Sequence, residues 1–258
     1  MSTIKVAAVQ FAPVFKDKMA NLRKMAFLVK QAAEGGAQLC VLPELCTTGY
    51  SFMSPEDARP FAEPIHPDAP TFKSMRVLAE TFKMYIAWGM VEVDPGTNEL
   101  HNSQVLVSPD GTWVHMAKIN RWGNDYLWCR PGRGNPPIMK AYFEAPNGGG
   151  LIEKKVGLLV CRDVRDKKDD NWSSFYEKGD ADIVCLSANW GDGGFPSVTW
   201  MDFVENNHAT LIVSNRYGKE TCNDFGEGGS CIIEPPDTIH CKGVKWDAEC
   251  IVYADLEG

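Results

Sequence analysis

The chain has 258 residues, of which 44% are hydrophobic and 23% are charged, and these proportions are ordinary for a globular protein. They argue against a collagen, a coiled coil or a wholly disordered chain. The formal net charge of −8 argues against nucleic acid or an anionic membrane as partner, because both attract basic surfaces. No apolar run approaches the roughly 20 residues of a membrane span. The N-terminus is a poor secretory signal, so we expect a cytoplasmic protein.

The first half of the chain alternates short apolar runs with amphipathic segments. Two helices are expected, at 17–34 and 71–83, and the stretch 47–70 between them is rich in Gly, Pro and acids and is typical of a loop. Strands are expected at 4–11, 38–42, 85–93, 101–108 and 112–118.

The second half continues in the same way, with helices expected at 169–178 and 199–208. Strands are expected at 138–144, 155–160, 181–187, 211–215, 230–234 and 250–256. The segment 120–135 has no clear period. Strands that alternate with helices, with hairpins between them, favour a layered α/β fold with two mixed sheets between helices. Because no linker, repeat or low-complexity tract interrupts the pattern, we treat 1–258 as one domain.

Common cofactor and nucleophile motifs are missing or incomplete. Phe11-Ala12-Pro13 follows the first strand where a dinucleotide site needs GxGxxG, and neither a Walker sequence nor HExxH occurs. Nine cysteines are spread over the chain without a CxxC pair, so zinc-ribbon spacing is absent. We expect reduced, mostly buried thiols, one of which can still be a nucleophile.

Three polar residues stand where apolar strands end: Glu44, Lys118 and Cys161. In α/β sheets, sites are usually built at the carboxyl ends of strands, so these side chains can converge on one point. A thiol needs a base to become a nucleophilic thiolate, and Glu44 suits that role. The Lys118 ammonium can stabilise the oxyanion that forms when a carbonyl or nitrile carbon is attacked.

The motifs around these residues resemble the nitrilase (carbon–nitrogen hydrolase) superfamily, in the family's order and across essentially the whole chain. They are, with the sequence letters in brackets, Val6–Gln10 (VAAVQ), Leu42–Leu45 (LPEL), Lys118–Asn120 (KIN), Gly157–Asp163 (GLLVCRD), Ala188–Trp190 (ANW), Ser214–Arg216 (SNR) and Ile232–Pro235 (IIEP). The resemblance implies a four-layer α-β-β-α sandwich, a Glu44-Lys118-Cys161 triad, a covalent thioester or thioimidate intermediate, and neither a metal nor another cofactor. It also implies a homodimer or higher homo-oligomer.

The chain departs from the family pattern at several positions. Asn120 stands where the family usually has His, and Asp125 stands where a second Glu is usual, six residues before Pro-Gly. Asp163 is kept and is expected to fix the turn that presents the nucleophile, although the family's following Pro-Glu is missing. Arg162 and Arg165 are unusual: they either bind a substrate carboxylate or, as we prefer, pair with the neighbouring acids Asp163, Asp166 and Asp169.

Further supporting roles follow from the resemblance. The backbone N–H of Arg162 is expected to help hold the oxyanion. Tyr50, Trp128 and Trp190 are the candidate walls of the substrate pocket, with plain core packing as the alternative for such aromatic residues.

The function that the resemblance implies is an amidase that converts a small linear amide to an acid and ammonia through a Cys161 thioester. A nitrilase or an N-carbamoyl-amine amidohydrolase is the alternative chemistry. A catalytically silent binding protein with the nitrilase fold is the alternative from another class, because Asn120, Asp125 and the missing Pro-Glu depart from the pattern.

Overall fold

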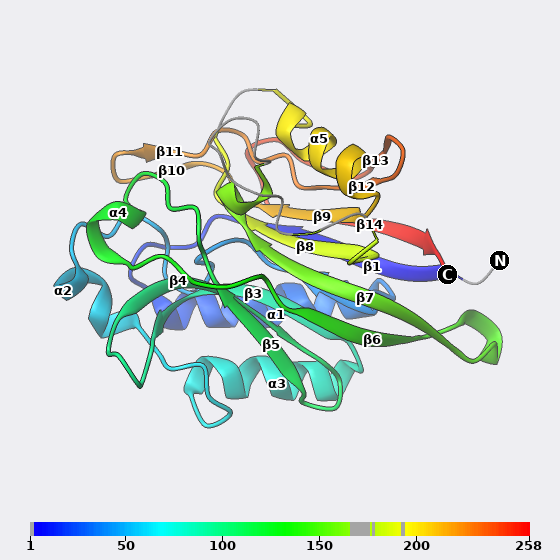
Figure 1. The fold of residues 1–258 in the computed structure, drawn as a ribbon, viewed down its shortest axis with the longest axis horizontal. Coiled ribbons are helices and arrows are strands. Elements are labelled where there is room, and N and C mark those ends of the chain that lie inside the picture. The colour runs from blue at the N-terminus through cyan, green and yellow to red at the C-terminus, as the bar shows by residue number, and fades with distance from the viewer. Residues whose placement is uncertain (1–2, 166–175, 177–178, 192–193) are drawn as a thin grey trace.

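The computed structural model describes residues 3–165, 176, 179–191 and 194–258, and two six-stranded sheets make up its centre (Figure 1). In the first sheet the strands lie in the order β14-β1-β2-β3-β4-β5. Their bounds are β1 (Thr3–Gln10), β2 (Leu39–Val41), β3 (Tyr85–Val93), β4 (Leu100–Val107), β5 (Trp113–Ala117) and β14 (Cys250–Glu257). Strands β1, β2 and β3 run parallel and the other pairs are antiparallel, so the sheet is mixed.

The second sheet has the order β13-β12-β9-β8-β7-β6 and is mixed in the same way. Its strands are β6 (Ile138–Glu144), β7 (Leu151–Val160), β8 (Ile183–Ala188), β9 (Thr210–Asn215), β12 (Cys231–Glu234) and β13 (Thr238–His240). The parallel strands β7, β8 and β9 form its middle. A two-stranded hairpin of β10 (Lys219–Glu220) and β11 (Asn223–Asp224) stands apart from both sheets.

Helices cover the outer faces of the two sheets. Helices α1 (Lys18–Glu34) and α3 (Pro70–Phe82) lie against the first sheet, and α5 (Val198–Asn207) lies over the second (Figure 1). The expected α-β-β-α sandwich with two mixed sheets is therefore confirmed. Of the helix expected at 169–178, only Tyr176 lies within the described residues.

Helix α1 shows why these segments form helices. Its apolar residues Met25, Leu28, Val29 and Ala32 recur at helical spacing and are buried against the first sheet. The carboxylate of Asp17 caps the first turn, since it accepts a hydrogen bond from the N–H of Ala20 at 2.9 Å.

The remaining short elements lie in the loops: α2 (Pro55–Ala58), α4 (Asp125–Trp128), and the 3₁₀ turns η1 (Arg59–Phe61), η2 (Pro146–Gly148) and η3 (Cys161–Val164). Both α2 and α4 fall in segments where the sequence predicted no helix, because four residues are too few to show a period. Strand β7 begins at Leu151 rather than at 155, and its extra residues pair with β6 in a long hairpin (Figure 1).

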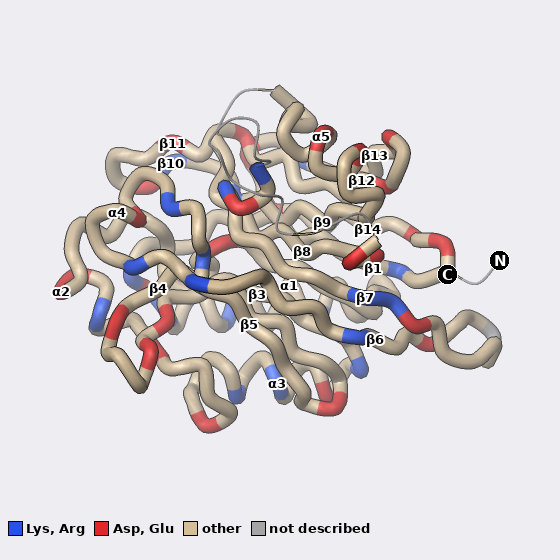
Figure 2. The backbone as a smooth tube through the Cα atoms, viewed as in Figure 1, with Lys and Arg blue, Asp and Glu red and all other residues tan. Residues whose placement is uncertain are grey.

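The cysteines are mostly buried, as the sequence predicted, with two exceptions. All nine cysteines are free and seven are buried, but Cys222 is exposed and Cys241 is partly exposed, so these two are not core residues. Acidic and basic residues are interspersed over the molecule (Figure 2). Within the described ranges, no helix has both the length and the apolar character that crossing a bilayer requires.

Polar side chains bridge the two sheets at the level of the strand ends. The hydroxyl of Ser187 on β8 donates to the carbonyl of Leu42, just after β2, at 2.7 Å. It accepts a hydrogen bond from the amide Nε2 of Gln104 on β4 at 2.8 Å. Because Ser187 is completely buried, water cannot replace either partner.

We expect Ser187→Ala to lower the free energy of unfolding by about 1–3 kcal/mol, because the buried carbonyl of Leu42 loses its side-chain donor and the Gln104 amide keeps only its bond to the carbonyl of Cys185. Urea unfolding followed by circular dichroism measures the effect. The matched control is Ser74→Ala, since the Ser74 hydroxyl bonds the carbonyl of Pro70 at 2.8 Å but is exposed. Equal losses for the two variants would contradict the prediction.

Candidate active site

Glu44 is held against the first sheet by close backbone packing. The chain leaves β2 and the N–H of Gly89 on β3 donates to the carbonyl of Pro43 at 3.3 Å. A Cβ atom at Gly89 would lie only 2.7 Å from the Cα of Glu44 and 2.4 Å from the nitrogen of Leu45. Only glycine therefore allows this segment to approach β3, and the Glu44 side chain is completely buried as a result.

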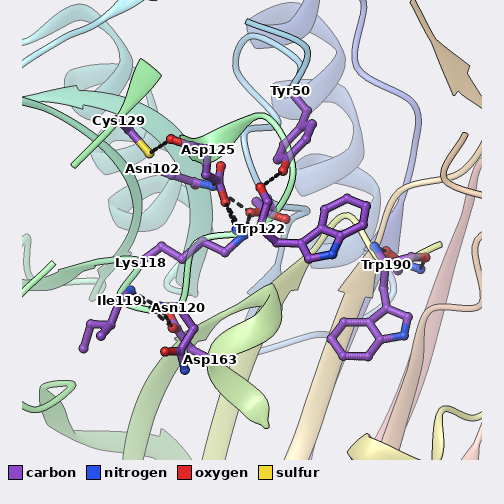
Figure 3. A network of polar contacts seen from close by, with 12 residues as sticks. Tyr50, Asn102, Lys118, Ile119, Asn120, Trp122, Asp125, Cys129, Asp163 and Trp190 are labelled. Carbon is purple, nitrogen blue, oxygen red and sulfur yellow. Dashed lines mark hydrogen bonds and ion pairs between the residues drawn. The ribbon is translucent and has the colours of Figure 1, made fainter. Parts of the chain in front are cut away.

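Lys118 follows β5 and its ammonium lies between two carboxylates (Figure 3). Its Nζ is 2.7 Å from Oε1 of Glu44 and 2.8 Å from Oδ2 of Asp125 at the start of α4. All three side chains are 1% exposed or less. The sequence-predicted pair of Glu44 and Lys118 is thus brought into direct contact, and Asp125 joins it.

Asn102 on β4 completes this cluster, and sequence reasoning did not single it out. Its Nδ2 donates to Oε1 of Glu44 at 2.7 Å and to Oδ1 of Asp125 at 3.2 Å. The N–H of Trp122 donates to the other oxygen of Asp125 at 3.0 Å. The one available signal was a run of polar residues, HNSQ, inside a strand whose every residue is buried.

Cys161 is the first residue after β7 and begins the η3 turn. Its φ is +48°, a left-handed conformation that non-glycine residues rarely adopt and that often marks functional positions. The residue is 5% exposed. Its thiol shares an electrostatic environment with Glu44 and Lys118, since both charges act on its pKa.

Burial and the neighbouring charges act together on the pKa of each group in the cluster, partly in opposite directions. Burial raises the pKa of Glu44, and the negative charge of Asp125 raises it further, against the opposing effect of Lys118. Burial by itself lowers the pKa of Lys118, but the two carboxylates outweigh it and hold that pKa well above its usual value. Burial and the Glu44 carboxylate raise the pKa of the Cys161 thiol. The resting site therefore holds a neutral thiol beside an ammonium that is always charged.

Asp163 links the turn after β7 to the segment after β5. Its Oδ1 accepts hydrogen bonds from the backbone N–H groups of Asn120 at 2.6 Å and Ile119 at 3.2 Å (Figure 3). These bonds fix the turn that carries Cys161 next to Lys118. Asn120 takes part through its backbone, and its side-chain oxygen has no partner.

A small pocket opens at Cys161. It is lined by Trp122, Cys161, Arg162, Arg165, Asn189, Trp190 and Gly191, and its volume is about 20 Å³. The guanidinium of Arg165 stacks over the Trp190 ring, with its central carbon 5.4 Å from the ring centroid. Of the acids that the sequence offered as partners of the two arginines, Asp166 and Asp169 lie outside the described residues.

Two of the three aromatic candidates for the pocket wall are not among the lining residues. Trp128 is buried in an apolar cluster, 5.6 Å from the ring of Phe52. Tyr50 is also buried there, and its hydroxyl donates to the carbonyl of Trp122, so it supports the pocket from behind (Figure 3). Trp190 does line the pocket. Within the described part of the chain, no group of three or more His, Cys, Asp or Glu has the arrangement of a metal site.

A second buried ion pair holds the Tyr50 segment in place. Glu220 accepts hydrogen bonds from the N–H groups of Tyr50 at 2.7 Å and Ser51 at 2.8 Å through Oε1. Its Oε2 pairs with the guanidinium of Arg216 at 2.7 Å, and this guanidinium stacks on the ring of Phe225 at 4.2 Å. The loop after β9 thereby positions a loop that follows β2.

Comparison with known proteins places this chain in a family. The sequence profile of the carbon–nitrogen hydrolases matches residues 5–257. A nitrilase from Pyrococcus abyssi is 32% identical over 232 residues, covering 90% of this chain and 82% of the relative. A protein N-terminal amidase from Schizosaccharomyces pombe is 25% identical, covering 90% of this chain and 91% of the relative.

Solved structures share the fold. An amidase from Nesterenkonia sp. superposes with a TM-score of 0.77 and 21% sequence identity, covering 99% of this chain and 90% of that one. The sequence profile spans nearly every residue from β1 to β14, including the strand ends that carry Glu44, Lys118 and Cys161. This chain belongs to the carbon–nitrogen hydrolase family.

Proposed function

We propose that this protein is a cysteine-dependent amidase that converts a small linear primary amide to a carboxylic acid and ammonia. The observation that carries the proposal is the buried contact of Glu44 with Lys118, 2.7 Å apart, beside the strained Cys161. A base, a fixed cation and a thiol, all 5% exposed or less, are the groups that acyl transfer through a thioester requires.

In the first half-reaction the Glu44 carboxylate takes the thiol proton as the Cys161 sulfur attacks the amide carbon. The new C–S bond turns the carbonyl oxygen into an oxyanion, which the Lys118 ammonium and the backbone N–H of Arg162 stabilise. Glu44 then returns its proton to the amide nitrogen as the C–N bond breaks. Ammonia leaves, and the acyl group stays on Cys161 as a thioester.

In the second half-reaction water attacks the thioester carbon while Glu44 accepts one of its protons. The C–S bond breaks, the acid is released, and the proton on Glu44 returns to the Cys161 sulfur. Asp125 and Asn102 act as positioning residues, because their side chains contact those of Lys118 and Glu44, which they hold in place.

Proteins similar to this chain support amide chemistry. Variants of the Nesterenkonia amidase have been solved in complex with butyramide and with an acetamide group added at the active-site cysteine. An omega-amidase from Danio rerio is 27% identical, covering 100% of this chain and 89% of the relative. Nitriles stand as the second candidate substrate, because the Pyrococcus abyssi relative is named a nitrilase.

Cys161→Ala is expected to abolish ammonia release from amides, with a loss of at least about a thousandfold in kcat, because no other group can form the thioester. An ammonia assay over acetamide, butyramide, glutaramate-type amides, N-carbamoyl amines and nitriles measures the activity. Cys222→Ala is the matched control, since Cys222 is an exposed thiol away from the pocket lining.

The same panel of compounds distinguishes the amidase from the alternative functions. Release of ammonia from nitriles but not from amides would assign nitrilase chemistry instead. No turnover of any compound, together with iodoacetamide labelling of Cys161 no faster than of the other thiols, would refute the enzyme and favour a binding protein.

The pH profile tests the role of Glu44. Since burial and Asp125 raise its pKa above the ordinary 4.5, the base form is lost while the pH is still above that value. We therefore expect the acidic limb of kcat/KM to lie above pH 4.5. Asp125→Asn removes a negative neighbour, so the limb should move to lower pH even though kcat falls.

Asp68→Asn is the control for this profile, because Asp68 is an exposed residue in the loop before α3 and should leave the limb in place. An acidic limb that does not move in Asp125→Asn would show that Glu44 is not the titrating base.

The stability of the turn that holds Cys161 depends on pH through Asp163. Burial raises the pKa of Asp163 from 3.8 to about 7, despite the hydrogen bonds from Asn120 and Ile119 and the nearby Lys118 ammonium. Between these two values the unfolded chain ionises while the folded protein keeps the proton, so the stabilising contribution is complete below pH 3.8 and is lost as the pH rises to about 7.

Asp163→Asn has no such titration. We expect the wild type to exceed this variant in stability by more at pH 4.5 than at pH 7.5, as measured by urea unfolding at both values. A difference that stays constant or widens with rising pH would contradict the raised pKa.

A further inference from the structure

A second, larger pocket adjoins the pocket at Cys161. We call it the aromatic pocket, after the five rings that line it: Trp190, Phe195, Trp200, Phe225 and Trp246. Its volume is about 360 Å³, whereas the pocket at Cys161 measures about 20 Å³. Trp190 and Gly191 line both, so the two spaces meet at the segment that follows β8.

The size of the smaller pocket limits what it can hold. A volume of about 20 Å³ is room for one or two water molecules, so the pocket can take the reacting end of a substrate but not a longer acyl chain. The remainder of any larger bound substrate must extend outside this pocket. The aromatic pocket is the adjoining space that shares part of that wall with it.

The rings of the aromatic pocket are rigidly packed yet partly open to solvent. Phe195 and Trp246 meet edge to face, with centroids 5.0 Å apart and planes at 82°, and Trp246 is 48% exposed. Trp190 and Trp200 pack at 5.7 Å. Fixed ring faces that still have an open side are favourable for an incoming aromatic ring, because edge-to-face and offset contacts add to the burial of apolar area.

The charges around the pocket disfavour a cationic occupant. Two of its five rings already bind the chain's own cations: the guanidinium of Arg165 stacks on Trp190, and that of Arg216 stacks on Phe225 at 4.2 Å. An organic cation would have to approach these guanidinium groups. Glu227 also borders the pocket, but it is exposed at the rim, where water screens its charge.

We propose that the aromatic pocket binds an uncharged aryl group on the acyl chain of the substrate, so that arylalkyl amides are preferred to alkyl amides. The inference rests on the proposed amidase reaction: because the leaving group is ammonia, the acyl chain is the only part of the substrate that varies. Burial of a phenyl ring in this pocket should raise kcat/KM about tenfold or more over the unsubstituted chain.

The test compares each phenyl-substituted amide with its parent: phenylacetamide with acetamide, 3-phenylpropionamide with propionamide, and 4-phenylbutyramide with butyramide. At least one pair should show the tenfold preference in kcat/KM. The ratio should fall toward one in Trp246→Ala, and Phe195→Leu should lower it as well. Trp113→Ala, which removes a half-exposed tryptophan from β5, is the matched control and should keep the wild-type ratio.

Three results would overturn the proposal: hydrolysis of alkyl amides without any aryl preference, a preference that survives both Trp246→Ala and Phe195→Leu, or faster turnover of 3-aminopropionamide, which carries an ammonium, than of the phenyl compounds. Circular dichroism confirms that each variant is folded.

A binding measurement keeps this proposal separable from the reaction itself. Calorimetry with the Cys161→Ala protein should show tighter binding of 3-phenylpropionamide than of propionamide, and Trp246→Ala in the same background should remove the difference. If the wild type hydrolyses no amide but this difference is found, the amidase assignment fails while the aryl site stands. If amides are hydrolysed and the difference is absent, the aryl site fails alone.

Discussion

One ammonium buried between two carboxylates is the constraint on which the rest of the structure depends. Charges removed from water are costly unless each is paired and hydrogen-bonded, and removal of one partner leaves an uncompensated charge. Lys118 meets this condition only because Glu44, Asp125 and Asn102 arrive from three separate segments. The ends of β2, β4 and β5 and the start of α4 must therefore be placed together, and the sheet holds them there.

The requirement that buried charges be paired applies to a second site as well. Arg216 and Glu220 form another buried ion pair. The second carboxylate oxygen of Glu220 accepts hydrogen bonds from the N–H groups of Tyr50 and Ser51. The hydroxyl of Tyr50 then bonds the carbonyl of Trp122, whose own N–H holds Asp125. A chain of hydrogen-bonded polar groups thus runs from the loop after β9 to the ammonium of Lys118, and each member fixes the position of the next.

The sequence predicted the features that follow from hydrophobic periodicity and from the positions at which strands end. Buried strands such as 85–93 show as apolar runs, and Glu44 and Lys118 stand where such runs stop. Strands β2 and β5 run in the same direction within the mixed sheet, so their carboxyl ends lie at one edge, where the two side chains meet. Asn102 escaped notice because its role depends on which face of β4 it occupies relative to two distant loops. Trp128 was expected in the pocket but packs on Phe52, since nothing local in sequence tells which way a ring in a short helix points.

The proposed reacting groups and the rings of the aromatic pocket differ in the same way, because the former lie at strand ends and most of the latter lie in loops. The groups proposed to react, Glu44, Lys118 and Cys161, follow strands of two packed sheets, where a shift of one side chain would disturb the core. The rings of Trp190, Phe195, Phe225 and Trp246 come instead from connections around β8, α5, β11 and β14, which the sheets do not fix in register. Substitutions in those connections can change the shape of the aromatic pocket without disturbing the charges at Lys118. On this fold the proposed choice of substrate is therefore free to vary while the proposed reaction at Cys161 is held constant, and Trp190 and Gly191 line both pockets.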